Sequence, residues 1–338
     1  MYAAQGRAVP AGQQSTGNLK KMFMVCSLIS AGNPGMMKAV DLHVFEQKGA
    51  LILKWFHFYE NGRIRLGVQT LGGPVNIAAT AARRHLAAPA DLHELLAGGD
   101  DALAQVERLL AGKTVPVAQP VRYAPAVPRP GKILCVGLNY RDHTAEIAMD
   151  KPDQPVLFSK FSNTIAAHQQ DIPFPEEAAK LDYEAELVAV VGRGGSHIAE
   201  EDAPAHIFGY TVGNDVSERV LQFQSTQWLM GKSWDHFAPI GPYVVTADEV
   251  DAGNLDIACR VNGEVRQRAN TRDMLFTPAA VLAYVSRYIT LEPGDILVTG
   301  TPGGVMQGRP PEEQHWLRPG DVVEADIQGI GTLQPRFV

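Results

Sequence analysis

The chain has 338 residues, 45% of them hydrophobic and 20% charged, which is typical of a soluble globular protein with one large domain or two ordinary ones. Its formal charge of −7, without a long run of one sign, disfavours nucleic acid and anionic membrane as partners. The cysteines Cys26, Cys135 and Cys259 are too scattered for a disulfide framework or a zinc ribbon and suit a reducing cytoplasm.

Residues 1–50 are expected to be a poorly structured extension. Lys20-Lys21 followed by Met22–Gly32 faintly resembles the charged and apolar regions of a signal peptide. The apolar stretch starts late, is short and contains two serines, so the pattern favours an extension over a secretion signal. No apolar run approaches the ~20 residues that span a bilayer.

Residues 51–115 are predicted to form a small N-terminal α+β domain. Two β-type runs flank Asn61-Gly62, a dipeptide that favours a hairpin turn. Two helices rich in Ala and Leu are predicted at Ala79–Ala87 and Asp91–Leu110, and Asp91 is a candidate N-cap. Residues 116–130 contain five prolines, a density that excludes a helix or a central strand and predicts a linker.

Residues 131–338 are predicted to be the catalytic, metal-binding domain. A helix is expected over Pro278–Tyr288. Short β-type runs lie at Ile133–Val136, Glu186–Val191, Tyr243–Val245, Ile296–Thr299 and Asp321–Ile327. The pattern predicts a β-rich α+β fold, because the regular strand–helix alternation of a doubly wound sheet is missing.

Glu184 and Glu186 lie two residues apart at the start of a nearly all-apolar run, Leu187–Val191. In a strand these two side chains share a face, so their carboxylates would repel each other and lose solvation at the mouth of a buried strand. A bound divalent cation would offset that cost. An exposed strand end with one carboxylate paired to an arginine explains the pattern equally well.

Asp215 ends another apolar run at Gly213-Asn214-Asp215, just before a helix-like segment at Val216–Arg219. It is a candidate third oxygen ligand, although a helix N-cap is the better interpretation of this position alone. Three carboxylates would suit Mg²⁺, with Mn²⁺ as a substitute, and leave positions for water and substrate. The resulting negative charge calls for a nearby cation, and Lys232 is the candidate, against the alternative of a solvated surface lysine.

Two further segments carry groups suited to catalysis. His143 and Glu146 are spaced to meet on one helical face, where the carboxylate would fix the imidazole tautomer of a general base; a surface pair is the alternative. Thr299–Gly304 is a glycine-rich turn after a strand, which either cradles a carboxylate with backbone N–H groups or is a plain turn.

Together and in this order, these segments resemble the fumarylacetoacetate hydrolase family, which includes acylpyruvate hydrolases and 2-hydroxyhepta-2,4-diene-1,7-dioate isomerases. The likeness runs from Lys132 to about Leu333. It rests on the motifs Val136–His143, Phe158–Lys160, Asp182–Glu186, Gly213–Ser217, Gln227-Trp228, Gly231–Asp235, Thr299–Gly303 and Leu317–Asp321.

The resemblance implies a β-rich roll or barrel-like mixed sheet, a homodimer and a catabolic enzyme. By position it implies Glu184, Glu186 and Asp215 as metal ligands. It further implies His143 and Glu146 as the pair that activates water, with Lys232 as a catalytic cation. The implied substrate-binding residues are Tyr140, Lys160, Arg219, Gln222 and Thr301.

The implied reaction is hydrolysis of a carbon–carbon bond in an acylpyruvate or related 2,4-dioxo acid. The metal, Mg²⁺ or Mn²⁺, would act as a Lewis acid, and pyruvate would leave as an enolate stabilised by the metal and Lys232. The same scaffold also suits oxaloacetate decarboxylation and 2-oxo acid hydration or tautomerisation. A non-catalytic 2-oxo acid binding protein is a further alternative. We expect a cytoplasmic enzyme with no nucleic-acid or membrane partner.

Overall fold

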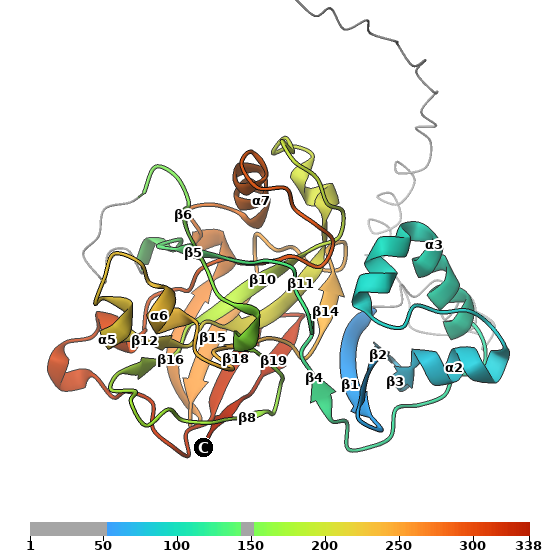
Figure 1. Ribbon diagram of the computed structural model, residues 1–338, viewed down its shortest axis with the longest axis horizontal. Helices are drawn as coiled ribbons and strands as arrows, with labels where there is room; N and C mark the ends of the chain where they lie inside the picture. Colours follow the sequence, from blue (N-terminus) through green and yellow to red (C-terminus); the bar gives the residue numbers. More distant parts are fainter. Residues whose placement is uncertain (1–52, 143–151) are drawn as a thin grey trace, which may run out of the picture. The chain divides into compact units, whose positions relative to one another are not determined.

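The computed structural model describes residues 53–142 and 152–338. Figure 1 shows two long neighbouring strands, β10 (Ala185–Val191) and β11 (Ile207–Asn214), in the middle of a ten-stranded sheet. The sheet runs β3-β2-β1-β14-β11-β10-β17-β5-β6, with β4 paired to β1. Its other members are β1 (Lys54–Glu60), β2 (Arg63–Thr70), β3 (Gly73–Asn76), β4 (Tyr123–Ala124), β5 (Ile133–Gly137), β6 (Val156–Ser159), β14 (Val244–Thr246) and β17 (Ile296–Val298).

The sheet is mixed, because β17 pairs with β5 in parallel while β10 pairs antiparallel with both β11 and β17. Every residue of β10 is buried. Leu187 and Ala189 belong to one hydrophobic cluster, whereas Val188 and Val190 on the opposite face belong to another. A strand covered on both faces has no polar side, which explains the continuous apolar run in the sequence. The predicted β-rich α+β fold is confirmed.

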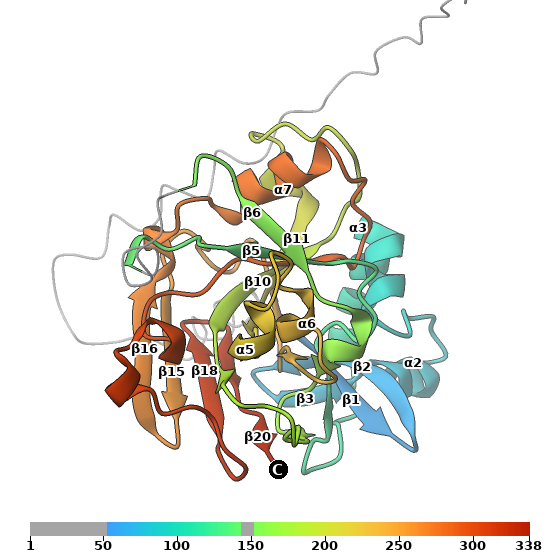
Figure 2. The ribbon, with the colours of Figure 1, turned by 60° about the vertical axis from the view of Figure 1, so that its left-hand side comes forward.

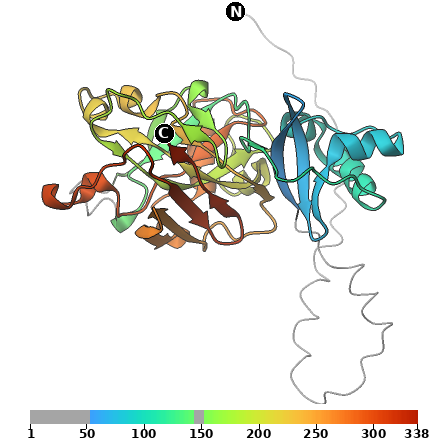
Figure 3. The same ribbon diagram turned by 90° about the horizontal axis from the view of Figure 1, so that it is seen from below.

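The first hairpin forms where the sequence predicts it. Asn61 and Gly62 have φ angles of 50° and 73°, the left-handed pair that a tight two-residue hairpin requires. Helices α2 (Ile77–Arg84) and α3 (Leu92–Leu110) pack beside β1–β3, as Figure 3 shows. Asp91 caps α3 by accepting from Glu94 N at 2.9 Å, as predicted. Helix α2 begins two residues earlier than predicted, because Asn76 Oδ1 accepts from Ala79 N.

The proline-rich segment 116–130 makes ordered contacts with the first strands. Its strand β4 pairs with β1, and Val117 N donates to Pro74 O at 2.8 Å. Contacts group Leu51–Val338 into one compact unit. The boundaries of the small domain and the linker at 115 and 130 stay predictions.

A second sheet has four strands in the order β16-β15-β18-β19, and Figure 2 shows β15, β16 and β18 side by side. Its strands are β15 (Asp256–Val261), β16 (Glu264–Asn270), β18 (Val323–Ile327) and β19 (Gly331–Leu333). Alternate residues such as Ile257 and Cys259 are buried against the core, so the other face of this sheet carries polar side chains.

Short elements complete the described chain. Three two-stranded pairs join β9 (Leu181–Asp182) to β12 (Ser217–Glu218), β7 (Ile165–Ala166) to β13 (Ala238–Pro239), and β8 (Asp171–Ile172) to β20 (Arg336–Phe337). The remaining helices are α5 (Arg219–Gln222), α6 (Leu229–Lys232) and α7 (Pro278–Ser286). The 3₁₀ turns are η1 (Ser162–Thr164), η2 (Ala203–His206), η3 (Thr271–Asp273), η4 (Met306–Gly308) and η5 (Pro311–Glu313).

Helix α7 begins at a cap that the sequence supplies, because Thr277 Oγ1 accepts from Ala280 N and Pro278 occupies the first helical position. Among the helices of the described residues, none is both long enough and apolar enough to cross a bilayer.

Candidate metal centre and active site

Three carboxylates meet where β10 begins and β11 ends. These strands are antiparallel, with Glu186 opposite Gly213, so the start of one lies beside the end of the other. Asp215 N donates to Glu184 O at 2.9 Å, which fixes the two backbones together. The carboxylates of Glu184, Glu186 and Asp215 are buried, and one oxygen of each lies within 4.8 Å of the others. The structure therefore brings together the three residues that were predicted as metal ligands.

The cluster carries more negative charge than burial tolerates. Burial raises the pKa of Glu186 well above its usual range, and the charges of Asp215 and Glu184 raise it further. Within residues 53–142 and 152–338, no lysine, arginine or histidine forms an ion pair with Glu186. A buried carboxylate without a cationic partner is costly, and a divalent cation shared with Glu184 and Asp215 would remove that cost.

The donor set fits a hard cation. All three candidate ligands are carboxylate oxygens, the donors that Mg²⁺ and Mn²⁺ prefer. The alternative of an exposed strand end for Glu184 and Glu186 is wrong in its exposure, since both are buried at 5% exposure or less. Its arginine pairing is present, because Arg219 Nη2 lies 2.7 Å from Glu184 Oε1. The residues present therefore fit a divalent metal.

Lys232 lies against two of the carboxylates. Its ammonium is 2.8 Å from Glu184 Oε2 and 3.0 Å from Asp215 Oδ2, and the side chain is buried. Burial alone would lower the pKa of Lys232, but the charges of Asp215 and Glu184 outweigh it, so the pKa is raised and the group stays cationic. The alternative of a solvated surface lysine is wrong.

Lys160 completes the surroundings of Asp215. Its ammonium donates to Asp215 Oδ1 and to Val216 O, the latter at 3.0 Å. Burial lowers the pKa of Lys160.

The N-cap interpretation of Asp215 is wrong, because residues 217–218 are in strand β12 and Glu218 caps α5 by accepting from Leu221 N at 2.7 Å.

Arg219 connects the cluster to a second buried carboxylate, Asp182. Its Nη2 lies 2.7 Å from Glu184 Oε1 and 2.9 Å from Asp182 Oδ2, while Nη1 donates to Gln222 Oε1 at 2.9 Å. Burial opposes the charge of Arg219, but Asp182 and Glu184 raise its pKa. The predicted substrate-binding pair Arg219 and Gln222 is thus brought together one contact away from a candidate metal ligand.

The glycine-rich turn after β17 holds a carboxylate, but that carboxylate belongs to the protein. Gly300 N donates to Glu186 Oε2, so the carboxylate at this turn is that of a candidate metal ligand. Thr301 Oγ1 donates to Ala185 O at 2.9 Å and accepts from Gln267 Nε2 at 2.8 Å. Both contacts brace the start of β10, so the turn positions the candidate ligands.

Tyr140 lies in the segment that follows β5. Its neighbour Asn139 bonds to the backbones of Phe276 and Thr299. The Tyr140 side chain is fully buried, and its hydroxyl has no hydrogen-bond partner among the residues that the structure describes. Burial together with the charge of Glu186 raises the pKa of Tyr140. The predicted base His143 and its partner Glu146 lie outside the described residues.

Sequence reasoning missed the residues that hold the site in place. Asp182 binds Arg219, Gln267 Oε1 accepts from Ala185 N at 3.0 Å, and Asn214 Oδ1 accepts from Glu184 N at 2.9 Å. Asp182 lies two residues before Glu184, the same spacing that singled out Glu184 and Glu186, so that signal was present. Gln267 is far away in the sequence and left no such signal.

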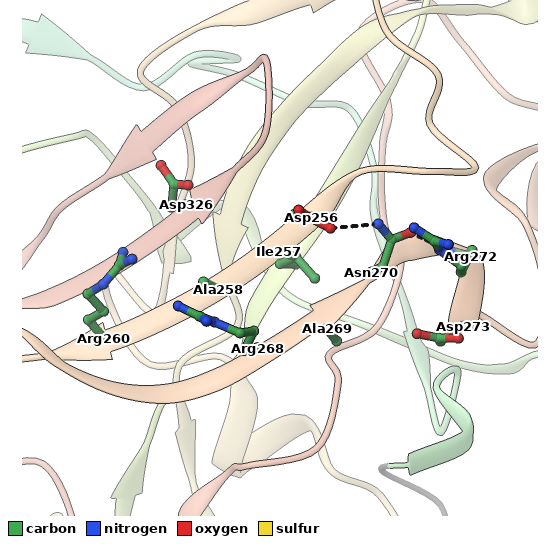
Figure 4. Close-up of a pocket in the computed structure, with 10 residues that line it drawn as sticks. All are labelled: Asp256, Ile257, Ala258, Arg260, Arg268, Ala269, Asn270, Arg272, Asp273 and Asp326. Atoms are coloured by element: carbon green, nitrogen blue, oxygen red, sulfur yellow. Dashed lines mark hydrogen bonds between the residues drawn. The ribbon is translucent and has the colours of Figure 1, made fainter.

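A pocket also lies away from the acidic cluster, on the polar face of the second sheet. Figure 4 shows this pocket of about 690 Å³, where arginines and aspartates such as Arg260, Arg268 and Asp326 surround Ala258. Asp256 in this pocket accepts from Asn270 Nδ2 at 2.8 Å. Among the described residues, the only group of acidic, histidine or cysteine side chains close enough to hold a metal is that of Glu184, Glu186 and Asp215. The volume of this pocket therefore does not mark it as the metal centre.

Comparisons with known proteins identify the family of the chain. Residues 132–338 match the family model of the fumarylacetoacetate hydrolase C-terminal domain. The chain is 43% identical over 256 residues to a mitochondrial oxaloacetate tautomerase of Rattus norvegicus, covering 75% of this chain and 81% of the relative.

Two solved structures share the fold. Fumarylacetoacetate hydrolase from Exiguobacterium antarcticum gives a TM-score of 0.73 at 35% identity, covering 84% of this chain and 99% of that one. Maleylpyruvate hydrolase from Sphingobium sp. SYK-6 gives 0.68 at 28% identity, covering 85% and 99%. The chain therefore belongs to the fumarylacetoacetate hydrolase family and is one of its enzymes, acting on a small-molecule substrate.

Proposed function

We propose that the chain catalyses keto–enol tautomerisation of a small 2-oxo acid, with oxaloacetate as the first candidate, at the cluster of Glu184, Glu186 and Asp215. The observation that carries the proposal is the Lys232 ammonium held against two of three buried carboxylates. The relative with 43% identity is named an oxaloacetate tautomerase, which supports this choice among the reactions of the family.

The metal is part of the proposal. Mg²⁺, or Mn²⁺ in its place, would be held by Glu184, Glu186 and Asp215, whose oxygens converge. When bound, it supplies Lewis-acid chemistry to the adjacent oxygens of a 2-oxo carboxylate.

The residues of the chain handle the charge that the reaction creates. Loss of a proton from C3 of the ketone moves an electron pair into the C2–C3 bond and leaves negative charge on the 2-oxygen. Lys232 is cationic and buried, so it stabilises that charge in a setting where electrostatic interactions are strong. A proton then returns to the oxygen to give the enol, and the reverse sequence gives the ketone. The family resemblance implies His143 and Glu146 as the pair that activates water, and we propose that in tautomerisation the same pair takes the C3 proton.

Hydrolysis of an acylpyruvate is the second candidate. The fold match to maleylpyruvate hydrolase, together with the His143–Glu146 pair, favours it. In this reaction the elements of water add to the distal carbonyl, the carbon–carbon bond next to it breaks, and the released enolate takes a proton to become pyruvate. Both reactions place the same negative charge beside Lys232, so they differ in the bond that breaks, C3–H or carbon–carbon, and not in the charge to be stabilised.

The two candidates are separated by following two substrates with one preparation. Decay of the ultraviolet absorbance of oxaloacetate enol measures tautomerisation, and pyruvate release from acetylpyruvate measures hydrolysis, each with Mg²⁺ and with EDTA. Faster enol decay without pyruvate release supports the tautomerase. Pyruvate release with unchanged enol decay supports the hydrolase and overturns the tautomerase.

Two expectations beyond the reaction are also proposals, namely a homodimer and a cytoplasmic location. Light scattering of the purified chain tests the first, and cell fractionation tests the second.

A further inference from the structure

Arg219, which pairs with Glu184 of the acidic cluster (Glu184, Glu186 and Asp215), also lines a pocket of about 260 Å³. The pocket is lined by Lys180, Arg219, Val220, Phe223, Gln224 and Gln307. Because Arg219 Nη2 lies 2.7 Å from Glu184 Oε1, the pocket begins one side chain away from a candidate metal ligand. It is small for a ligand pocket, since sites for whole drug-sized ligands span roughly 300–1,000 Å³.

Two fully buried carboxylates fix the walls of this pocket. Asp182 accepts from Arg219 Nε at 2.9 Å and from Gln307 N at 3.0 Å, so one residue holds two walls. Glu218 accepts from Lys180 N at 2.9 Å and caps α5, the helix that carries Val220. Neither acid takes part in the proposed proton transfer. Buried charges are expensive to maintain, and here they hold the pocket in one shape.

The free polar groups of the pocket suit a carboxylate. The Lys180 ammonium lies 5.5 Å from the Trp316 ring centroid, and no carboxylate of residues 53–142 or 152–338 forms an ion pair with it. In the same part of the chain, the side-chain amides of Gln224 and Gln307 form no hydrogen bond. Arg219 adds positive potential, although Asp182 and Glu184 share its charge.

The rim adds a short apolar surface. Phe223 is 54% exposed and Val220 41% exposed. Among the described residues, the pocket thus offers an ammonium without an ion pair and two side-chain amides without hydrogen bonds, beside an apolar edge. These groups match a carboxylate on a short carbon chain. An ammonium and a planar amide both donate to carboxylate oxygens, and such charge-assisted bonds are about twice as strong as neutral ones.

We infer that this pocket binds the distal carboxylate of a dicarboxylic substrate and that Lys180 is the residue that selects it. The inference rests on the proposed function, because it takes the 2-oxo carboxylate of the same molecule to lie at the acidic cluster. Lys180 is thus a specificity-determining residue, and oxaloacetate is preferred over 2-oxo acids whose far end carries no charge.

The test compares two substrates in three variants. Lys180→Met removes the charge while keeping most of the side-chain length, Lys180→Arg keeps the charge, and Lys113→Met changes an exposed lysine outside the pocket. The ratio of kcat/KM for oxaloacetate enol to kcat/KM for phenylpyruvate enol is measured for each. We expect Lys180→Met to lower the ratio about tenfold, through KM for oxaloacetate, as for loss of one charge-assisted contact. Lys180→Arg should restore most of it, and Lys113→Met should match the wild type.

An unchanged ratio in Lys180→Met, or an equal loss for both substrates, would overturn the inference. Thermal unfolding of the variants checks that they are folded. If the wild type does not accelerate tautomerisation, the proposed function fails. The role of the pocket is then tested by measuring hydrolysis of two acylpyruvates. Maleylpyruvate, which ends in a carboxylate, should respond to Lys180→Met, and acetylpyruvate, which ends in a methyl group, should not. An equal response of those two substrates would overturn the inference as well.

Discussion

The Lys232 ammonium lies 2.8 Å from Glu184 Oε2, with both side chains buried. Its second carboxylate neighbour, Asp215 Oδ2, is 3.0 Å away. This contact places a fixed positive charge beside the candidate metal ligands, where the 2-oxygen of a substrate would become negative. The proposed chemistry depends on that placement.

Replacing Lys232 should therefore affect the rate more than binding. We expect Lys232→Met to lower kcat by about 10²- to 10³-fold, the range seen when one preorganised oxyanion donor is removed. Lys232→Arg, which keeps the charge but changes its position, should recover part of that loss. Steady-state kinetics on oxaloacetate enol provide the measurement. A kcat for Lys232→Met within twofold of the wild type would refute the role.

Replacing Gly300 with alanine should destabilise the protein. Its φ is +96°, and an added Cβ would lie 2.8 Å from Asn139 Cβ and 3.0 Å from Val136 O. Gly320 is a matched control, since its φ is +97° but no atom lies within 4 Å of an added Cβ. Backbone strain should lower the free energy of unfolding of both alanine variants by about 1–3 kcal/mol. Gly300→Ala should lose more stability than Gly320→Ala, because its Cβ also meets neighbouring atoms. Urea unfolding measures the difference, and equal losses would contradict it.

Asp182 should be required for stability and for the position of Arg219. Asp182→Ala leaves the buried Arg219 with one carboxylate fewer and removes the acceptor of Met306 N and Gln307 N. Breaking a buried pair in this way costs about 3–5 kcal/mol. Asp182→Asn, which keeps acceptor oxygen but loses charge, should cost less. Chemical denaturation gives both values, and an alanine variant as stable as the wild type would contradict the network.

His57 should make the protein sensitive to acid. It is buried, its Nδ1 bonds to Ala126 O and its Nε2 accepts from Leu92 N, and burial lowers its pKa to about 4. The unfolded chain binds this proton near pH 6.5, so stability is full above pH 6.5 and falls as the pH drops toward 4. Burial lowers the pKa of His168 to about 4 as well, which acts in the same direction.

The contribution of His57 to this loss is about 3 kcal/mol for a lowering from 6.5 to about 4. In His57→Gln the free energy of unfolding should depend less steeply on pH in this window. Urea denaturation at pH 7, 5.5 and 4.5 measures the slope. If the free energy of unfolding depended equally steeply on pH in the variant and the wild type, His57 would not be a source of the acid sensitivity.

Local patterns in the sequence predicted much of the fold. The Asn61-Gly62 turn, the Asp91 cap and the apolar run after Glu186 each depend on neighbouring residues, and each forms as expected. Asp215 was harder, because a carboxylate before an apparent helix is typical of a cap. Only the pairing of β10 with β11 brings it next to Glu184 and Glu186.

The supporting contacts depend on residues distant in the sequence. Gln267 reaches Ala185 N across 82 positions, and Gly300 N reaches Glu186 across 114. Such contacts follow from how the sheets and turns are assembled, which short-range patterns do not encode. For the glycine-rich turn, the sequence left a carboxylate cradle and a plain turn as alternatives, and it did not indicate Glu186 as the partner of Gly300.

We propose above all that Glu184, Glu186 and Asp215 hold a divalent metal required for reaction with a 2-oxo acid. Titration of Mg²⁺ into EDTA-treated protein, followed by the rate of oxaloacetate enol decay, tests it most directly. We expect a saturable rise in rate for the wild type and none for Glu186→Gln. Full activity of the wild type without added metal, or a wild-type response in Glu186→Gln, would contradict it.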